Sequence, residues 1–191
     1  MNSFVVANPN KCIGCRTCEI ACVVAHSDKN IFELDTSEIE FHPRLSVVKT
    51  AKVSAPIQCR HCEDAPCANV CPEGSIVNKD GVVYIDKSTC IGCKTCIVAC
   101  PLGAIDLVAE YDDGEKVVQQ GLKVIENGKL CFKDKMIANK CDLCIGREKG
   151  PACAEVCPTD AFQIIKPVDI GESIKEKRRK SALELSKVST K

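Results

Sequence analysis

The segment CIGCKTCIVACP, residues 90–101, carries four cysteines at offsets of three, three and four residues, with a proline after the last: Cys90, Cys93, Cys96, Cys100 and Pro101. This is the spacing with which bacterial proteins hold [4Fe-4S] clusters. Three thiolates on a tight loop bind one cluster, and the fourth, on a short helix, ligates a different one. We expect Gly92 to let the loop close around inorganic sulfide, because a side chain would crowd it. A disulfide framework and a zinc site compete with this interpretation, and the spacing disfavours both.

The same run of cysteines occurs three more times along the chain. Residues 12–22, CIGCRTCEIAC, repeat the offsets, with Val23 in place of the proline. Two degenerate copies, residues 59–72 and 141–158, stretch the offset between the second and third cysteines to five and nine residues. The cysteines of these three motifs are Cys12, Cys15, Cys18 and Cys22; Cys59, Cys62, Cys67 and Cys71; and Cys141, Cys144, Cys153 and Cys157. The order short, long, short, long indicates a duplicated pair of motifs. Cys131 alone stands outside them, and we expect it to be a small buried residue and not a ligand.

The composition indicates that bound metal, rather than an organic core, stabilises the fold. The 191 residues include 17 cysteines but only five phenylalanines, two tyrosines and no tryptophan. A chain with so small a hydrophobic core needs disulfides or bound metal to be stable. The odd number of cysteines and the lack of a recognisable signal peptide disfavour disulfides. We find no stretch of transmembrane length. The net charge of zero gives no indication of nucleic-acid binding.

The segments between the motifs predict short strands and helices. We expect strands at residues 4–7, 45–53, 105–108 and 161–165, a helix at residues 19–25 that carries Cys22, and an exposed loop at residues 27–45. Asp80-Gly81 is a two-residue turn signal, so residues 75–85 are expected to form a β-hairpin.

Residues 109–137 form an insertion between the last two motifs. Gly121 and Asn127-Gly128 divide it into short apolar stretches, which predicts a second hairpin. A flap that faces a partner and a cover over a cluster are equally compatible with this sequence.

Few other polar residues stand out. His61 lies between two cysteines that complete their motif, so we favour a ring that donates a hydrogen bond to a sulfur or a carbonyl over a ligand. His26 and His42 are expected to be solvated. Basic residues flank the motifs at Lys11, Arg16, Arg60, Lys94, Lys140 and Arg147. Cations near an anionic cluster raise its potential, although ordinary surface charge is the favoured interpretation for any single one. No catalytic triad, phosphate-binding loop or carboxylate pair is evident, so we expect an electron carrier rather than an enzyme.

The last part of the chain changes character. Ser173 and Glu176 form a capping-box pattern that predicts a helix over residues 171–191. Its basic residues and partial apolar side are compatible with protein contact, with an anionic surface, or with a solvated tail. We divide the chain into a cluster-binding region, residues 1–166, and a basic helical tail, residues 167–191.

The motif order, with CRHCEDAPCANVCP second and NKCDLC opening the fourth, resembles the four-cluster ferredoxin-like subunits of molybdenum or tungsten pterin enzymes and of formate hydrogenlyase-type complexes. The likeness covers about residues 3–166 and is specific. The relatives that it indicates include the electron-transfer subunits of hydrogen-dependent carbon dioxide reductase. It implies four [4Fe-4S] clusters and a pairing of motif one with four and of motif two with three. The implied ligand sets are Cys12, Cys15, Cys18 with Cys157; Cys22 with Cys141, Cys144, Cys153; Cys59, Cys62, Cys67 with Cys100; and Cys71 with Cys90, Cys93, Cys96.

We therefore expect an α+β protein of two duplicated bacterial-ferredoxin-like units with a C-terminal helix. The resemblance implies a subunit that passes electrons between a formate dehydrogenase-type pterin subunit and a hydrogenase, with a homologous ferredoxin-like subunit as a further possible partner. A free polyferredoxin that serves several enzymes, and a structural or maturation scaffold, remain the alternatives. The basic tail favours an assembled subunit, because a diffusing carrier does not need it. We expect a cytoplasmic location, with membrane association only through the complex.

Overall fold

A computed structural model of the chain describes residues 1–27, 30–31, 33–35, 39–112 and 114–188. The helices are α1 (Thr17–His26), α2 (Pro66–Asn69), α3 (Thr95–Ala99), α4 (Ala152–Glu155) and α5 (Pro167–Val188). The strands are β1 (Phe4–Ala7), β2 (Leu45–Lys49), β3 (Ser54–Gln58), β4 (Ile76–Lys79), β5 (Val82–Ile85), β6 (Asp106–Ala109), β7 (Tyr111–Asp112), β8 (Glu115–Lys116), β9 (Val118–Glu126), β10 (Lys129–Asp134), β11 (Met136–Asn139) and β12 (Phe162–Ile165). Within these residues, no helix is long and apolar enough to cross a membrane.

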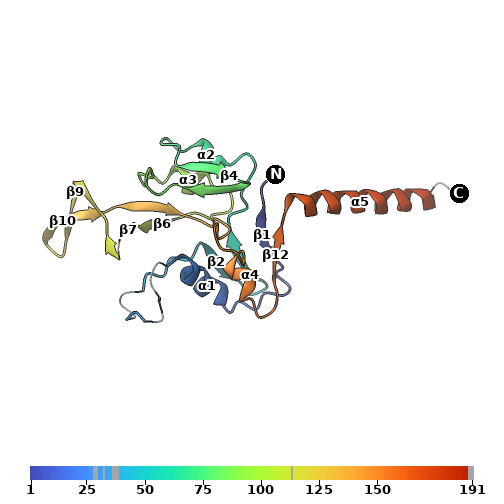
Figure 1. Cartoon of the computed structure of the whole chain (residues 1–191), viewed down its shortest axis with the longest axis horizontal. Coiled ribbons are helices and arrows are strands. Elements are labelled where there is room, and N and C mark those ends of the chain that lie inside the picture. The colour runs from blue at the N-terminus through green and yellow to red at the C-terminus, as the bar shows by residue number, and fades with distance from the viewer. Residues whose placement is uncertain (28–29, 32, 36–38, 113, 189–191) are drawn as a thin grey trace.

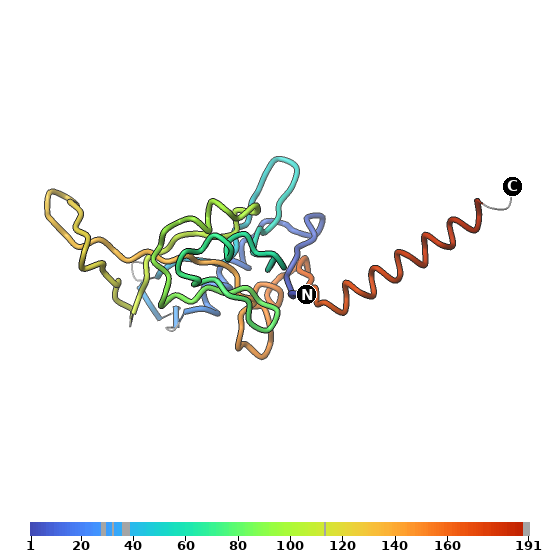
Figure 2. The backbone as a smooth tube through the Cα atoms, turned by 90° about the horizontal axis from the view of Figure 1, so that it is seen from above, coloured from blue at the N-terminus to red at the C-terminus, as the bar shows by residue number. Residues whose placement is uncertain are grey.

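The molecule has a central body from which two elements project in opposite directions (Figures 1 and 2). Helix α5 leaves one end as a single straight rod, and the β9–β10 hairpin leaves the other as an arm. The body holds the four short helices and the remaining strands, which pair two by two into small antiparallel sheets. This is the mixed α and β architecture that the sequence predicts.

Two of these sheets join parts of the chain that are far apart in sequence. Strand β1 pairs with β12, so that Val5 lies opposite Ile164, and β6 pairs with β11, so that Leu107 lies opposite Ala138. The β4–β5 hairpin forms as predicted, with positive φ angles of 53° at Asp80 and 77° at Gly81. Strand β12 therefore lies beside the first strand of the chain, and β11 lies beside β6 after the insertion.

The prediction of one strand over residues 45–53 is wrong. Strand β2 ends at Lys49, the chain reverses, and β3 returns antiparallel to it. Thr50 holds this turn, because its hydroxyl accepts a hydrogen bond of 3.0 Å from the Val53 amide while its own amide donates one of 2.8 Å to the Val53 carbonyl. The preceding loop, where described, forms no helix or strand and is only partly exposed.

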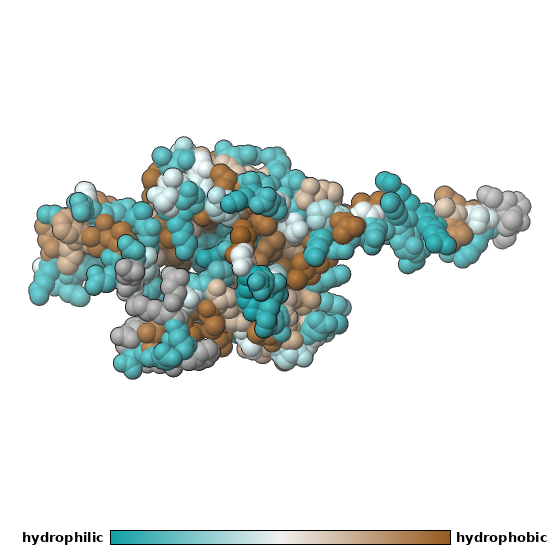
Figure 3. Space-filling model, viewed as in Figure 1, coloured by the Kyte–Doolittle hydropathy of each residue, from teal (hydrophilic) through white to brown (hydrophobic). Residues whose placement is uncertain are grey.

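The predicted start of the terminal helix is also wrong. Helix α5 begins at Pro167, not at the Ser173 capping pattern. Proline suits the first helical position because it has no amide hydrogen to leave unpaired there. Two residues later, the Asp169 carboxylate accepts a hydrogen bond of 2.8 Å from the Lys166 amide. None of the side chains of α5 is buried (Figure 3).

The insertion forms the predicted hairpin in a longer version. Strand β9 runs through Gly121 without a break, and Asn127 and Gly128 make the turn with φ angles of 51° and 76°. Both strands are exposed over almost their whole length, and Ile125, Leu130 and Phe132 place apolar surface on the arm (Figure 3).

Cysteines form much of what core the body has. One buried cluster comprises Ala65, Cys67, Ile76, Val83, Cys96, Ile105 and Ala138. A second comprises Cys22, Leu45, Val47 and Cys153. Helix α2 packs against α3 beside the first cluster and α1 against α4 beside the second. The Glu19 carboxylate of α1 accepts a hydrogen bond of 2.6 Å from the Val47 amide and so fixes this helix to β2.

Candidate metal centres

All four motifs open with a C-x-x-C loop of the same backbone form. The residue directly before the second cysteine has a positive φ angle in each: 70° at Gly14, 49° at His61, 64° at Gly92 and 58° at Leu143. A left-handed residue there turns the chain sharply. The two degenerate motifs therefore share with the two regular ones a left-handed residue directly before the second cysteine.

Gly92 is required because β11 passes close to its loop. A Cβ atom added to Gly92 would collide with the backbone carbonyl oxygen of Met136. That a side chain there would also crowd inorganic sulfide stays a prediction. The positive φ angle of Gly92 adds to the cost of a side chain.

Two hollows lie between the second and third motifs, and each is lined by four cysteines. Cys71 from one motif joins Cys90, Cys93 and Cys96 of the other around the first hollow. Cys59, Cys62 and Cys67 join Cys100 around the second. Each hollow contains about 360 Å³ of empty space, its open side included.

The first and fourth motifs also meet in space. Cys22 and Cys153 share a buried cluster, against which Cys18 packs. The negative charges of Cys141, Cys22 and Cys144 act on Cys153, whose pKa is raised first by burial and then by these thiolates. At the other end, the charge of Cys157 acts on Cys15. Cys12 is half-buried near this second pair.

The cysteine side chains fit an iron–sulfur cluster better than they fit disulfides. All seventeen are free thiols. Backbone amides donate hydrogen bonds to several sulfurs, for example Ala104 to Cys100 at 3.4 Å and Ala161 to Cys157 at 3.3 Å. Such bonds stabilise negative charge on a coordinating sulfur. These sites accordingly combine thiol ligands with donors that are oriented toward them.

Burial controls the protonation of the metal-free thiols. It raises the pKa of Cys18 to about 12 and that of Cys96 to about 11, so both hold their protons at neutral pH. The exposed thiols of Cys15 and Cys93 have lowered pKa values, because the hydroxyls of Thr17 and Thr95 hydrogen-bond to them. Metal binding must therefore displace protons from the inner cysteines, while the outer ones ionise more readily.

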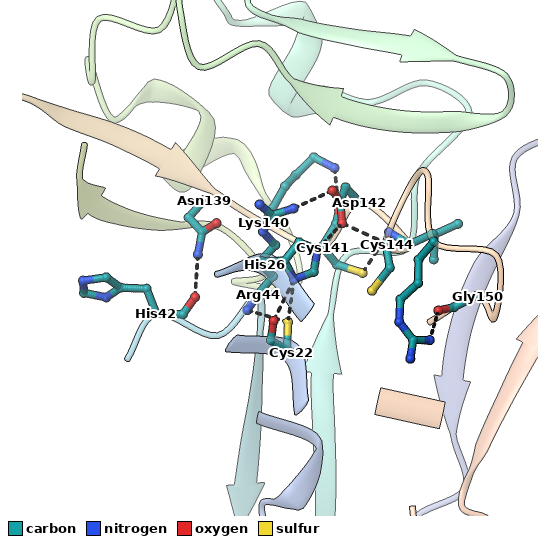
Figure 4. A network of polar contacts seen from close by, with 12 residues as sticks. Cys22, His26, His42, Arg44, Asn139, Lys140, Cys141, Asp142, Cys144 and Gly150 are labelled. Atoms are coloured by element: carbon teal, nitrogen blue, oxygen red, sulfur yellow. Dashed lines mark hydrogen bonds and ion pairs between the residues drawn. The ribbon is translucent and has the colours of Figure 1, made fainter. Parts of the chain in front are cut away.

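A network of charged side chains surrounds Cys22 and Cys144 (Figure 4). The Asp142 carboxylate accepts hydrogen bonds from His26 Nε2 at 3.0 Å and from Arg44 Nη1 at 2.5 Å. His26 Nδ1 donates to the Cys22 carbonyl at 2.7 Å. Burial alone would lower the pKa of His26, but its hydrogen bonds to Asp142, Cys144 and Cys22 outweigh it and raise the pKa to about 11.

The prediction that His26 is solvated is therefore wrong. It lies at the end of α1 with only 16% of its side chain exposed. His42 is exposed, as predicted.

His61 is fully enclosed and neutral. Burial, followed by the charge of Lys140, lowers its pKa to about 4. His61 Nδ1 lies 3.1 Å from both the amide and the carbonyl oxygen of Val83, so it accepts from the amide in one tautomer and donates to the carbonyl, as predicted, in the other. The Val83 carbonyl also accepts a hydrogen bond from Lys140 Nζ. Lys140 is thus buried, and for this residue the surface-charge interpretation is wrong.

Cys131 lies apart from every motif. It stands on β10 of the arm and is exposed, which corrects the expectation of a small buried residue. No residue of β9 or β10 lines either hollow, so the arm does not cover those sites.

Comparison with known proteins adds the biological context. A family model described as a 4Fe-4S dicluster domain matches residues 50–132, and one described as a 4Fe-4S binding domain matches residues 9–24. The "Electron transport protein HydN" of Escherichia coli (strain K12) is 46% identical over 186 residues, covering 96% of this chain and 99% of the relative. From the same organism, "Formate hydrogenlyase subunit 2" is 39% identical over 93% of this chain and 89% of its own length. "Hydrogenase-4 component A" is 36% identical over 95% and 91%.

Proposed function

The chain belongs to the ferredoxin-like iron–sulfur electron-transfer subunits of formate and hydrogen complexes, and from this we propose that it carries four [4Fe-4S] clusters in series. It is an electron-transfer subunit, not a catalytic one. The proposed ligand sets are Cys12, Cys15, Cys18 and Cys157; Cys22, Cys141, Cys144 and Cys153; Cys59, Cys62, Cys67 and Cys100; and Cys71, Cys90, Cys93 and Cys96.

One observation carries this proposal. The two hollows between the second and third motifs are each lined by three cysteines of one motif and the fourth cysteine of the other. That exchange of the fourth ligand is the arrangement of two-cluster ferredoxins. The contact of α1 with α4, together with the proximity of Cys22 to Cys153, supports the same exchange between the first and fourth motifs.

The fold fits two ferredoxin-like units that arose by duplication. The common φ pattern of the four C-x-x-C loops supports this history. In this arrangement residues 1–166 bind the clusters, and residues 167–191 form a separate tail.

We propose a formate dehydrogenase-type pterin subunit and a hydrogenase subunit as the redox partners. A bound [4Fe-4S] cluster accepts and returns one electron, and this chain supplies the thiols, amide donors and charges that hold it and set its potential. The names of two relatives, a formate hydrogenlyase subunit and a hydrogenase component, support such partners. A free polyferredoxin and an iron–sulfur scaffold protein are the competing functions.

The tail is proposed to mediate assembly. Helix α5 projects from the body (Figure 1). It spans 22 residues, and the exposed Ile174, Leu185 and Val188 lie on one side of it among basic residues. A helix of this kind offers an apolar strip to a partner's groove. A homologous ferredoxin-like subunit is one possible occupant.

The test begins with anaerobic iron and sulfide analysis of the purified chain. Four clusters of four irons give about sixteen irons per chain. A well-folded preparation that saturates near half this value would contradict the four-cluster proposal. Affinity capture from native extract then separates the functions, because an assembled subunit should retain a pterin enzyme or a hydrogenase. Capture of several unrelated enzymes would favour the free carrier, and capture of cluster-assembly proteins the scaffold.

A further inference from the structure

Lys140 is a charged side chain buried at the junction between the two halves of the body. Its relative exposure is 3%. Its Nζ atom donates a hydrogen bond of 3.0 Å to the carbonyl oxygen of Cys141 (Figure 4). It donates another to the carbonyl oxygen of Val83. Val83 lines the hollow formed by Cys59, Cys62, Cys67 and Cys100, while Cys141 belongs to a different ligand set. The ammonium group therefore bridges two of the proposed cluster sites.

This cation has no carboxylate partner among the residues that the structure describes. The nearby carboxylate of Asp142 pairs with His26 and Arg44 instead. The adjoining ring of His61 is 1% exposed and forms its hydrogen bonds with the Val83 backbone. Among the described residues, Lys140 thus donates only to backbone carbonyls.

An ammonium group buried without an opposite charge destabilises a protein by several kcal/mol. Buried lysines usually lose their proton or acquire a partner. Negative charge close to Lys140 in the working protein would compensate the burial of this ammonium group. Four thiolates at each of the two adjoining sites would provide it.

We propose that Lys140 is the shared counter-charge of the two inner cluster sites and raises the reduction potentials of both. The inference rests on the proposed ligand sets, the two inner ones being Cys59, Cys62, Cys67 with Cys100 and Cys22, Cys141, Cys144 with Cys153. Each one-electron reduction adds one negative charge to a site, and a fixed cation in a medium of low dielectric favours it. Lys140 acts as a positioning residue, since it touches backbone carbonyls and not the sulfurs.

The consequence is a profile of potentials along the chain of sites. The two outer sites lie at exposed cysteines, namely Cys15 and Cys93, whereas Lys140 lies between the inner two. Electrons that enter from either end would meet higher potentials in the middle. Such a profile keeps the carrier reduced internally and allows exchange at both ends.

The test compares Lys140→Gln with Lys140→Arg in the full chain. Glutamine retains donors for the two carbonyls but removes the charge, whereas arginine keeps the charge. Anaerobic redox titration followed by electron paramagnetic resonance should show two of the four midpoint potentials falling in Lys140→Gln. We expect at least a tenfold loss in the reduction equilibrium, which is about 59 mV for a one-electron couple. Lys79→Gln, an exposed site on β4, is the matched control.

Each outcome separates this inference from the proposed function. If Lys140→Gln holds full iron and its potentials match the Lys79→Gln control, Lys140 is not the counter-charge, although the four-cluster proposal stands. An equal fall in Lys140→Arg also overturns it, because the charge is then irrelevant. If Lys140→Gln loses iron and Lys140→Arg keeps it, the charge is needed to hold the clusters and the inference is supported. Loss of iron in both variants means that the size and shape of the side chain at this position, and not its charge, are needed to hold the clusters, and this overturns the inference. A wild-type chain with far fewer than about sixteen irons refutes the proposed function itself.

Discussion

Asp142→Asn tests the charged network beside Cys22. The carboxylate of Asp142 joins His26 at the end of α1 to Arg44 at the start of β2. Replacing it with an amide of similar shape keeps the packing but removes the negative charge. The guanidinium of Arg44 cannot lose its proton, so it would remain charged without an opposite charge.

The expected cost follows from the burial of the pair. The Arg44 side chain is 13% exposed and that of Asp142 22%, so water screens the interaction only in part. Breaking a buried ion pair by removing one partner costs about 3–5 kcal/mol. We take the lower end, about 3 kcal/mol, because neither side chain is fully enclosed. At about 1.4 kcal/mol per factor of ten, this corresponds to roughly a hundredfold larger open population.

The assay is the rate at which iron is lost to a strong chelator under anaerobic conditions. When opening and closing are fast relative to capture, this rate follows the open population. We therefore expect Asp142→Asn to lose part of its iron about a hundredfold faster than the wild type. Glu155→Gln is the matched control, since its partner Arg147 lies on the surface and Glu155 is 38% exposed. A surface pair contributes about 0–1 kcal/mol, so this variant should differ little from the wild type.

The pH dependence of the difference supplies a second check. The pKa of His26 is raised from 6.5 to about 11 in the folded chain. Its contribution to stability is therefore fully present below pH 6.5 and is lost as the pH rises to about 11. The gap between wild type and Asp142→Asn should shrink between about pH 6.5 and about pH 11. Equal iron-loss rates in the two proteins at neutral pH, or a gap that widens with pH, would refute the reasoning.

Three further predictions concern ligands and assembly. Cys22→Ser and Cys157→Ser should each remove a different cluster, as judged by electron paramagnetic resonance; identical spectral losses would mean that each motif binds its own cluster. Cys131→Ala should leave the iron content unchanged, and a lower count would make Cys131 a ligand after all. A chain that ends at Lys166 should keep its clusters and lose a partner or a higher-order assembly; unchanged sizing and affinity capture would show that α5 is only a solvated tail.

The cysteine motifs could be predicted because their information is local and chemical. Ligand spacing is set by the geometry of the metal group, and the turn at Asp80-Gly81 by the backbone freedom of its residues. The reversal after Lys49 could not be found in the same way. It uses the Thr50 hydroxyl in place of a glycine, which leaves only a weak signal in a stretch rich in β-branched residues.

The start of α5 shows a competing signal. Pro167 suits the first position of a helix as well as the end of the preceding strand, and the later Ser173 pattern appeared to be the stronger cap. The structure uses the earlier proline with Asp169, and the sequence contained both residues. The residue at which α5 begins depends on where β12 ends, and this is a property of the fold and not of the local residues.

The burial of charge was the least predictable feature, and its cause is the composition of the chain. His26 ends α1, Arg44 directly precedes β2 and Lys140 directly follows β11, so each lies at an element end where apolar periodicity does not distinguish an inward from an outward position. In an ordinary core, such charges would have to be replaced by apolar residues or paired one to one. Here Asp142 is shared by Arg44 and His26, while Lys140 has only carbonyls. Around Cys22 and Cys144 two cations share one carboxylate, and Lys140 has none among the described residues, so this part of the body is organised to receive a negatively charged group.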